Sequence, residues 1–208
     1  MKKIVRHPRH YCGAGFSLPL LFAALIAGCA SHPRASDRSL DTELAKKEND
    51  HALHLLDEGK LEEAESHLKR ALEADVMYGP AHNNMGLVYY HQGKLYPAAW
   101  EFQSAIKLMP YQPEPRNNLG LVFEKAGKIT SAAEAYEKAR QLEPDNPEFL
   151  ANLARAKVRR GDRDVETKKL LEELVMKDSR PQWSQWARIN LLRMGDPTSR
   201  PTTRPLDQ

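Results

Sequence analysis

Glycine recurs in this chain at a constant interval of 34 residues. The members of the series are Gly59, Gly93, Gly127, Gly161 and Gly195. Alanine follows the same step, because Ala64, Ala98 and Ala132 share one register. A period of about 20–50 residues indicates stacked structural units, and a period of about 34 is typical of helix–turn–helix arrays. We therefore predict an all-α fold built from antiparallel helix pairs.

Glycine has two different roles within each predicted unit. The glycines of the 34-residue series follow the first helix of each pair, where a positive φ ends a helix easily. Gly86 and Gly120 instead lie inside first helices, where glycine costs about 1 kcal/mol relative to alanine. We expect a neighbouring helix to approach too closely there for a Cβ atom, with Ala98 and Ala132 as its small residues.

Two units carry small and aromatic residues at matching positions. These are Gly86, Tyr89, Ala98, Phe102, Ala105 and Pro110 in one unit, and Gly120, Phe123, Ala132, Tyr136, Ala139 and Pro144 in the next. The pattern resembles the signature of the tetratricopeptide repeat, and the match runs from about Ala45 to Met194. The resemblance implies a right-handed superhelical array over 41–195. Its implied parts are four units at about 45–78, 79–112, 113–146 and 147–180, and a capping helix at 181–194.

The last part of the array departs from this signature. Glu166 and Glu173 replace the two packing alanines of the fourth unit's second helix. An apolar stripe remains, so we expect the helix to form but to pack differently. Trp183 and Trp186 are interpreted as a cover for the open end of the core; the alternative is a platform for a ligand. Residues 196–208 are rich in Pro, Thr and Ser, which predicts a disordered tail.

The first residues have the layout of a secretory signal. A basic start precedes an apolar run from about Phe16 to Ala27, which is too short to span a bilayer as a helix. The sequence Ile26-Ala27-Gly28-Cys29 resembles the lipobox of bacterial lipoproteins, which implies removal of residues 1–28 and acylation of Cys29. An ordinary cleaved signal and an uncleaved anchor remain the alternatives. Residues 29–40 are polar and predict a flexible tether.

The basic balance of the chain belongs to this leader. The whole chain has 31 Lys and Arg residues against 28 Asp and Glu residues, a formal net charge of +3. Residues 1–28 contain four of the basic residues and no acidic residue, so the remainder has 27 basic and 28 acidic residues, a net charge of −1. The array therefore offers no electrostatic basis for binding nucleic acid.

The resemblance implies that the first helices line a concave groove that binds a peptide. The residues that it places there are Asn83, Asn84, Leu87, Tyr90, Asn117, Asn118, Leu121, Asn152 and Arg155. An asparagine amide offers two donors and an acceptor, a suitable set for holding the backbone of an extended peptide. The alternative is that these amides form hydrogen bonds between neighbouring helices.

Basic residues follow the same register toward the C-terminal end of the groove. They are Lys125, Arg159 and Arg193, with Arg155 close by. This column predicts a basic end of the groove and an acidic stretch on the partner. A solvated charged face is the alternative interpretation.

The sequence gives little indication of chemistry. His51 and His54 are three residues apart on a predicted helix, but no third metal ligand accompanies them in sequence. The chain has no HExxH, G-x-S-x-G or P-loop motif, the patterns that mark common metal, acyl-transfer and nucleotide sites. We predict no metal, no cofactor and no enzymatic activity.

These observations predict a lipid-anchored adaptor or scaffold of the bacterial cell envelope. It would bind a peptide segment of an envelope protein during assembly of an envelope, pilus or secretion complex. In an organism with two membranes, we expect it at the outer membrane, facing the periplasm. The alternative is a structural lipoprotein that forms a homodimer through its C-terminal helix or the open end of the array.

Overall fold

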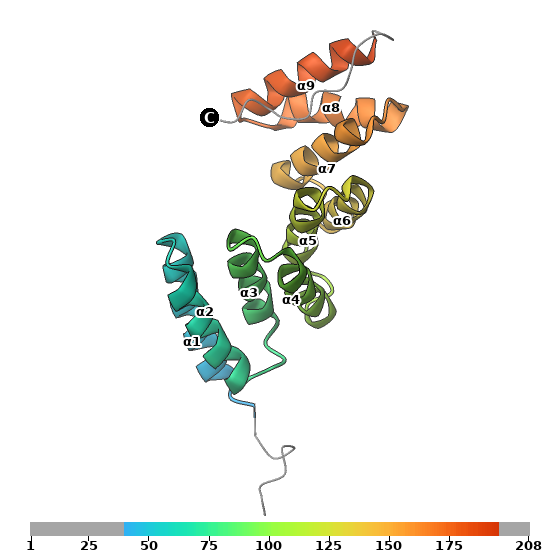
Figure 1. The fold of residues 1–208 in the computed structure, drawn as a ribbon. Coiled ribbons are helices and arrows are strands. Elements are labelled where there is room, and N and C mark those ends of the chain that lie inside the picture. Colours follow the sequence, from blue (N-terminus) through green and yellow to red (C-terminus); the bar gives the residue numbers. More distant parts are fainter. Residues whose placement is uncertain (1–39, 196–208) are drawn as a thin grey trace, which may run out of the picture. The chain divides into compact units, whose positions relative to one another are not determined.

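The described part of this computed structural model, residues 40–195, is entirely α-helical (Figure 1). Its nine helices are α1 (Thr42–Asp57), α2 (Leu61–Ala74), α3 (Gly79–His91), α4 (Leu95–Leu108), α5 (Glu114–Lys125), α6 (Ile129–Leu142), α7 (Pro147–Arg160), α8 (Val165–Lys177) and α9 (Pro181–Met194). None of these helices is long and apolar enough to cross a membrane. The expected signal at 1–28, Cys29, residues 30–39 of the tether and the tail at 196–208 lie outside the described residues.

Consecutive helices pack against each other along the chain. Helix α1 packs on α2, α3 on α4 and α5 on α6, and each pair also contacts the helix that follows it. First helices of successive units touch as well, since α1 contacts α3 and α3 contacts α5. The predicted all-α array of helix pairs is confirmed.

Four glycines of the 34-residue series adopt the left-handed conformation. Their φ angles are 73° at Gly59, 75° at Gly93, 75° at Gly127 and 94° at Gly161. In each turn the residue after the glycine donates its N–H to the carbonyl five residues back; Lys128, for example, donates to the carbonyl of Phe123 at 2.8 Å. This arrangement satisfies carbonyls that the end of a helix leaves free. Gly195 differs, because its φ is −77°, in the right-handed region.

The glycines inside first helices face aromatic rings. A Cβ atom on Gly86 would lie 2.7 Å from the ring of Phe102, and one on Gly120 would meet the ring of Tyr136. The close approach expected from the sequence is present, but its partner was wrong. The large aromatic residue of the second helix fills the space, rather than the small alanine.

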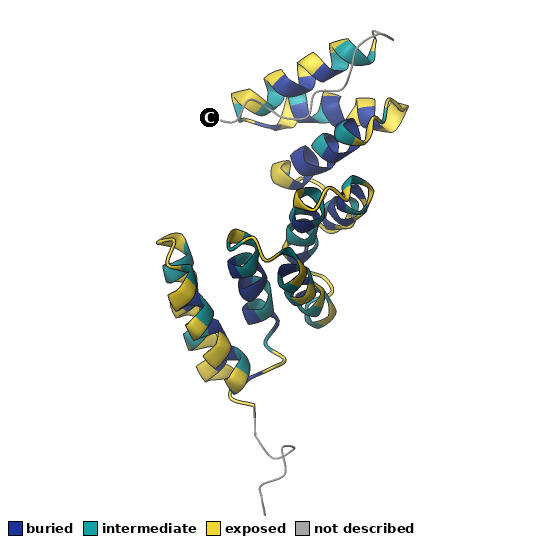
Figure 2. Ribbon diagram, viewed as in Figure 1, coloured by how far each residue is buried: buried dark blue, intermediate teal, exposed yellow. Residues whose placement is uncertain are grey.

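Buried residues follow the inner faces of the helices (Figure 2). Phe102 and Tyr136, the ring partners of the two glycines, are 1% and 0% exposed. In the last part of the array, Leu170, Leu171 and Leu174 of α8 join one cluster with Trp186 of α9. Trp186 is therefore a core residue, and Trp183 packs at the edge of the same cluster.

The fourth unit packs as its sequence predicts. Helix α8 contacts α9 more extensively than it contacts α7. Glu173, which stands where an alanine packs in other units, accepts a hydrogen bond from Arg140 of α6 at 2.8 Å. Glu166 lies on the surface and forms an ion pair with Lys157. The two carboxylates thus remain at the edge of the helix, and the leucines supply its core.

Candidate functional site

The predicted groove asparagines form amide pairs between first helices of successive units. Asn84 donates to the side-chain oxygen of Asn49 at 2.8 Å, and Asn152 donates to that of Asn117 at 2.9 Å. Between these pairs, Asn118 donates to Asn83 at 3.1 Å. Each bond joins residues 35 positions apart, so every bond links one unit to the next.

Burial divides these asparagines into two groups. Asn84, Asn117 and Asn152 are 6%, 2% and 5% exposed, whereas Asn83 and Asn118 are partly exposed. A buried polar group is costly unless it forms a hydrogen bond. The buried amides therefore form hydrogen bonds between helices. This is the alternative to peptide binding that the sequence allowed. A ligand can reach Asn83 and Asn118.

The two partly exposed asparagines share one side of their helices with further side chains, most of them apolar or aromatic. On α3, Asn83 is followed by Leu87 and Tyr90, and on α5 Asn118 is followed by Leu121 and Lys125. All of them except the exposed Lys125 are partly exposed. The spacings of three and four residues place each set on one side of its helix. We call these six residues the α3–α5 face.

Lys125 fixes the C-terminal end of this face. Its Nζ donates to the backbone carbonyl of Tyr90 at 3.3 Å and lies 4.5 Å from the centroid of the Tyr90 ring. The attraction of a cation to an aromatic face stabilises this position. Burial raises the pKa of the Tyr90 hydroxyl above its usual value. The tyrosine therefore stays neutral at physiological pH.

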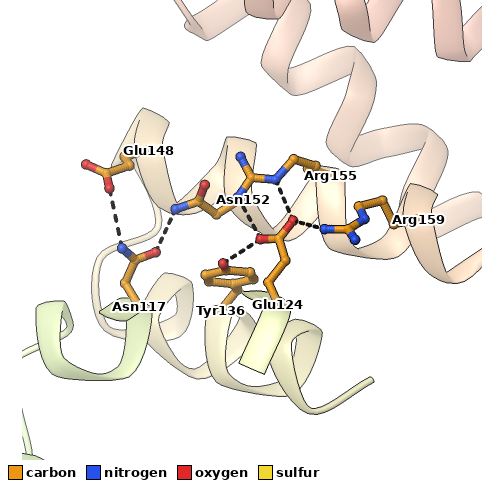
Figure 3. A network of polar contacts seen from close by, with 7 residues as sticks. All are labelled: Asn117, Glu124, Tyr136, Glu148, Asn152, Arg155 and Arg159. Carbon is orange, nitrogen blue, oxygen red and sulfur yellow. Dashed lines mark hydrogen bonds and ion pairs between the residues drawn. The ribbon is translucent and has the colours of Figure 1, made fainter. Parts of the chain in front are cut away.

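A glutamate lies among the residues of the predicted basic end (Figure 3). Glu124 accepts hydrogen bonds from Arg155 Nε at 2.9 Å and Nη2 at 2.7 Å. It also accepts from the hydroxyl of Tyr136 at 2.8 Å and from Arg159. Burial acts to raise the pKa of this carboxyl, but the hydrogen bonds and positive charge of Arg155 lower it overall.

This network reduces the positive charge at the predicted basic end of the groove. Arg155 and Arg159 are held by Glu124, so the three side chains together carry one positive charge rather than two. Arg193 also has interactions within the described chain. A sequence signal for the network was present: Glu124 and Arg159 are 35 residues apart, the same step that joins the asparagine pairs.

Within residues 40–195, no three His, Cys, Asp or Glu side chains are placed so that they could hold a metal ion. His51 stacks on His67 with ring centroids 5.4 Å apart. Glu48 lies 2.8 Å from His67 Nδ1 and accepts a hydrogen bond from Arg70 at the same distance. These contacts join α1 to α2.

Comparison with known proteins agrees with the helix-pair architecture. Two sequence models of the tetratricopeptide repeat match residues 49–113 and 124–189, together more than half of the chain. No curated protein matches the sequence.

Several solved structures share the fold. YrrB, a tetratricopeptide repeat protein described as having an unusual peptide-binding site, is 20% identical with a TM-score of 0.60, over 69% of this chain and 73% of its own. The first such domain of Spaghetti (RPAP3), bound to an HSP90 peptide, is 20% identical with a TM-score of 0.57, over 59% and 98%.

A third structure is the second repeat domain of human RPAP3 in complex with an HSP70 peptide. It is 25% identical with a TM-score of 0.52, over 55% of this chain and 96% of its own. The family models and the shared superhelical fold of helix pairs lead to one conclusion. The chain belongs to the tetratricopeptide repeat family.

Proposed function

We propose that this protein is a membrane-anchored adaptor that holds a peptide segment of a cell-envelope protein on the α3–α5 face. The observation that carries the proposal is the fixed, accessible amide pair of Asn83 and Asn118, joined at 3.1 Å. The pair is flanked by the partly exposed Leu87 and Leu121. Amides supply backbone hydrogen bonds, and the leucines supply apolar contacts for alternate side chains of an extended peptide.

The comparisons support peptide binding as the general activity. The two RPAP3 domains were solved with bound peptides, and YrrB is described by its peptide-binding site. Protein and peptide interaction is also the general role of the family, which is not typically enzymatic. The envelope partner, the assembly role and the anchor remain parts of our proposal.

Site-specific photo-crosslinking in cells tests the proposed face. A photoreactive residue at Leu87 should give a discrete adduct with a partner, because Leu87 is partly exposed and its replacement breaks no described hydrogen bond. The matched control is Lys169, an exposed residue of α8, which should give no such adduct. An equal adduct from both positions, or none from Leu87, would contradict the proposal.

Homodimerisation is the second candidate function. Leu192 of α9 and Met176 of α8 are both 78% exposed, which leaves apolar surface at the C-terminal end. Trp186 does not contribute to this surface, because it is 4% exposed. Adducts in which the chain cross-links only to itself would favour this alternative over the adaptor.

The lipid anchor rests on the resemblance of Ile26-Ala27-Gly28-Cys29 to a lipobox. Several acyl chains give stable membrane attachment, since each buried CH₂ contributes about 0.8 kcal/mol. We expect Cys29→Ser to accumulate as an uncleaved precursor that takes up no radiolabelled fatty acid. Normal cleavage of the variant would refute the anchor but leave the α3–α5 face untouched.

A further inference from the structure

A cavity of about 460 Å³ opens between α4, α5 and α6. Its apolar lining consists of Ile106 from α4, Leu119 and Phe123 from α5, and Ala135 from α6. Leu119 and Phe123 are partly exposed. The volume lies within the range of about 300–1,000 Å³ that is typical of ligand sites.

The cavity lies on a different side of α5 from the α3–α5 face. With 3.6 residues per turn, Leu119 and Phe123 are on roughly the opposite side of the helix from Asn118 and Leu121. A ligand in this cavity therefore does not compete for the proposed groove. The cavity is a second, separate candidate site.

The repeat provides its own comparison, because the same inter-helix position occurs in the units on either side. One repeat earlier, His82 and Glu101 occupy the places of Arg116 and Ala135, and His82 Nδ1 lies 2.7 Å from the Glu101 carboxylate. Burial acts to lower the pKa of His82, but the bond to Glu101 raises it overall. In this earlier unit, the contact between His82 and Glu101 therefore bridges the position that remains open between α4 and α6.

One repeat later, apolar packing closes the equivalent position. Leu150 and Leu153 take the places of Arg116 and Leu119, and they are 1% and 0% exposed. Two of the three equivalent positions are therefore filled by side chains of the chain itself. The position between α4, α5 and α6 remains open, whereas side chains fill the equivalent positions on either side of it.

Positive charge surrounds the open position. Lys107, Arg116 and Lys138 line it from α4, α5 and α6, and Glu134 is the single acidic residue of the lining. Lys107 and Lys138 are exposed and form no ion pair within residues 40–195. Arg116 donates to the backbone carbonyl of Gln112 at 3.1 Å, which leaves its charge uncompensated.

We propose that this cavity binds a short acidic segment of a partner protein, with one large apolar side chain seated over Leu119 and Phe123. The three cations stand on three different helices, so several carboxylates of one peptide can meet them together. An amphiphile with a single carboxylate cannot do so. The chain's own flanking segments do not fit, because 29–39 and 196–208 carry no net negative charge.

A synthetic peptide pair tests the proposal on the full chain in detergent. One fluorescent peptide carries a central benzoylphenylalanine flanked by glutamates, and its counterpart carries glutamines in their place. We expect the glutamate peptide to bind about tenfold more tightly and to cross-link to the α4–α6 cavity. Equal binding of the two peptides, or cross-links to the α3–α5 face instead, would overturn the proposal.

Charge reversal identifies the residues responsible. The double variant Lys107→Glu and Lys138→Glu should weaken binding of the glutamate peptide by about tenfold. The control double variant Lys128→Glu and Lys169→Glu has the same net charge and alters exposed lysines elsewhere; we expect it to bind within about twofold of the wild type. Equal weakening in both variants would show that the effect comes from net charge alone, and it would overturn the proposed site.

Two further outcomes would assign the cavity to another occupant. Saturable binding of dodecanoate that the Lys107→Glu and Lys138→Glu variant loses, with no binding of the glutamate peptide, would indicate a small amphiphile. Dimerisation of the chain that the same variant loses would indicate a second copy. Asn118→Ala separates this site from the proposed groove, because it should leave binding of the glutamate peptide unchanged.

Discussion

Glu124 shows how a single residue changes the electrostatics of the array. Its side chain is 10% exposed, and its carboxylate accepts hydrogen bonds from Arg155, Arg159 and Tyr136. Arg155 and Arg159 belong to the fourth unit and Glu124 to the third, so the contact joins the two units. Residue types alone indicated a basic groove, because the compensating acid lies in the preceding unit. Only the 35-residue step between bonded partners reveals it.

We predict that Glu124→Gln lowers the free energy of unfolding by about 2–3 kcal/mol, because it leaves the largely buried Arg155, whose side chain is 17% exposed, without its opposite charge. Urea unfolding measures the effect, with Glu134→Gln on the exposed side of α6 as control, expected within about 0.5 kcal/mol of the wild type. Since the folded-state pKa of Glu124 is lowered, its contribution is present above the ordinary carboxyl pKa and is lost as pH falls through the folded value.

The difference between wild type and Glu124→Gln should therefore narrow in acid. A difference that stays constant from neutral to acidic pH would show that the charge of Glu124 does not carry the stabilisation. An effect equal to that of Glu134→Gln would show that Glu124 contributes no more to stability than an exposed carboxylate.

At the scale of elements, α5 connects both candidate sites with the core. Asn118 and Leu121 point to the α3–α5 face, Leu119 and Phe123 line the α4–α6 cavity, and Gly120 packs on Tyr136. The sequence predicted this helix and its exposed asparagine. It did not predict the cavity. In the preceding unit the hydrogen-bonded His82 and Glu101 stand at the places of Arg116 and Ala135, and in the following unit the buried Leu150 stands at the place of Arg116.

The asparagine columns show a similar limit of sequence reasoning. Asn117 and Asn118 are adjacent in sequence and belong to the same kind of column, yet one is buried and the other is partly exposed. Adjacent residues differ by about 100° around a helix, so a small rotation decides which one faces the neighbouring unit. The residue type predicts that each amide forms a hydrogen bond, either to a neighbouring helix or to a ligand. Packing decides which of the two roles each residue has.

At the scale of the whole molecule, the 34-residue step was enough to predict the helix-pair array. The step fixes the spacing of turns and packing residues, and both are local properties that a sequence carries directly. Whether a surface of the array can bind a ligand depends on side chains from different units, which come together only in the folded protein. In the fold, the row of buried amides that stabilises the array is distinct from the accessible face that we propose as the peptide-binding site.

The most direct test of this proposal compares cross-linking from Leu87 in the Asn118→Ala and Asn152→Ala proteins. Asn152→Ala leaves a buried acceptor on Asn117 without its donor, so it should lower unfolding free energy by about 1–2 kcal/mol while the adduct persists. Asn118→Ala should remove most of the adduct with a smaller loss of stability, because its partner Asn83 remains accessible to water. Equal adduct yields in the two folded variants would contradict the assignment of the accessible pair to peptide binding.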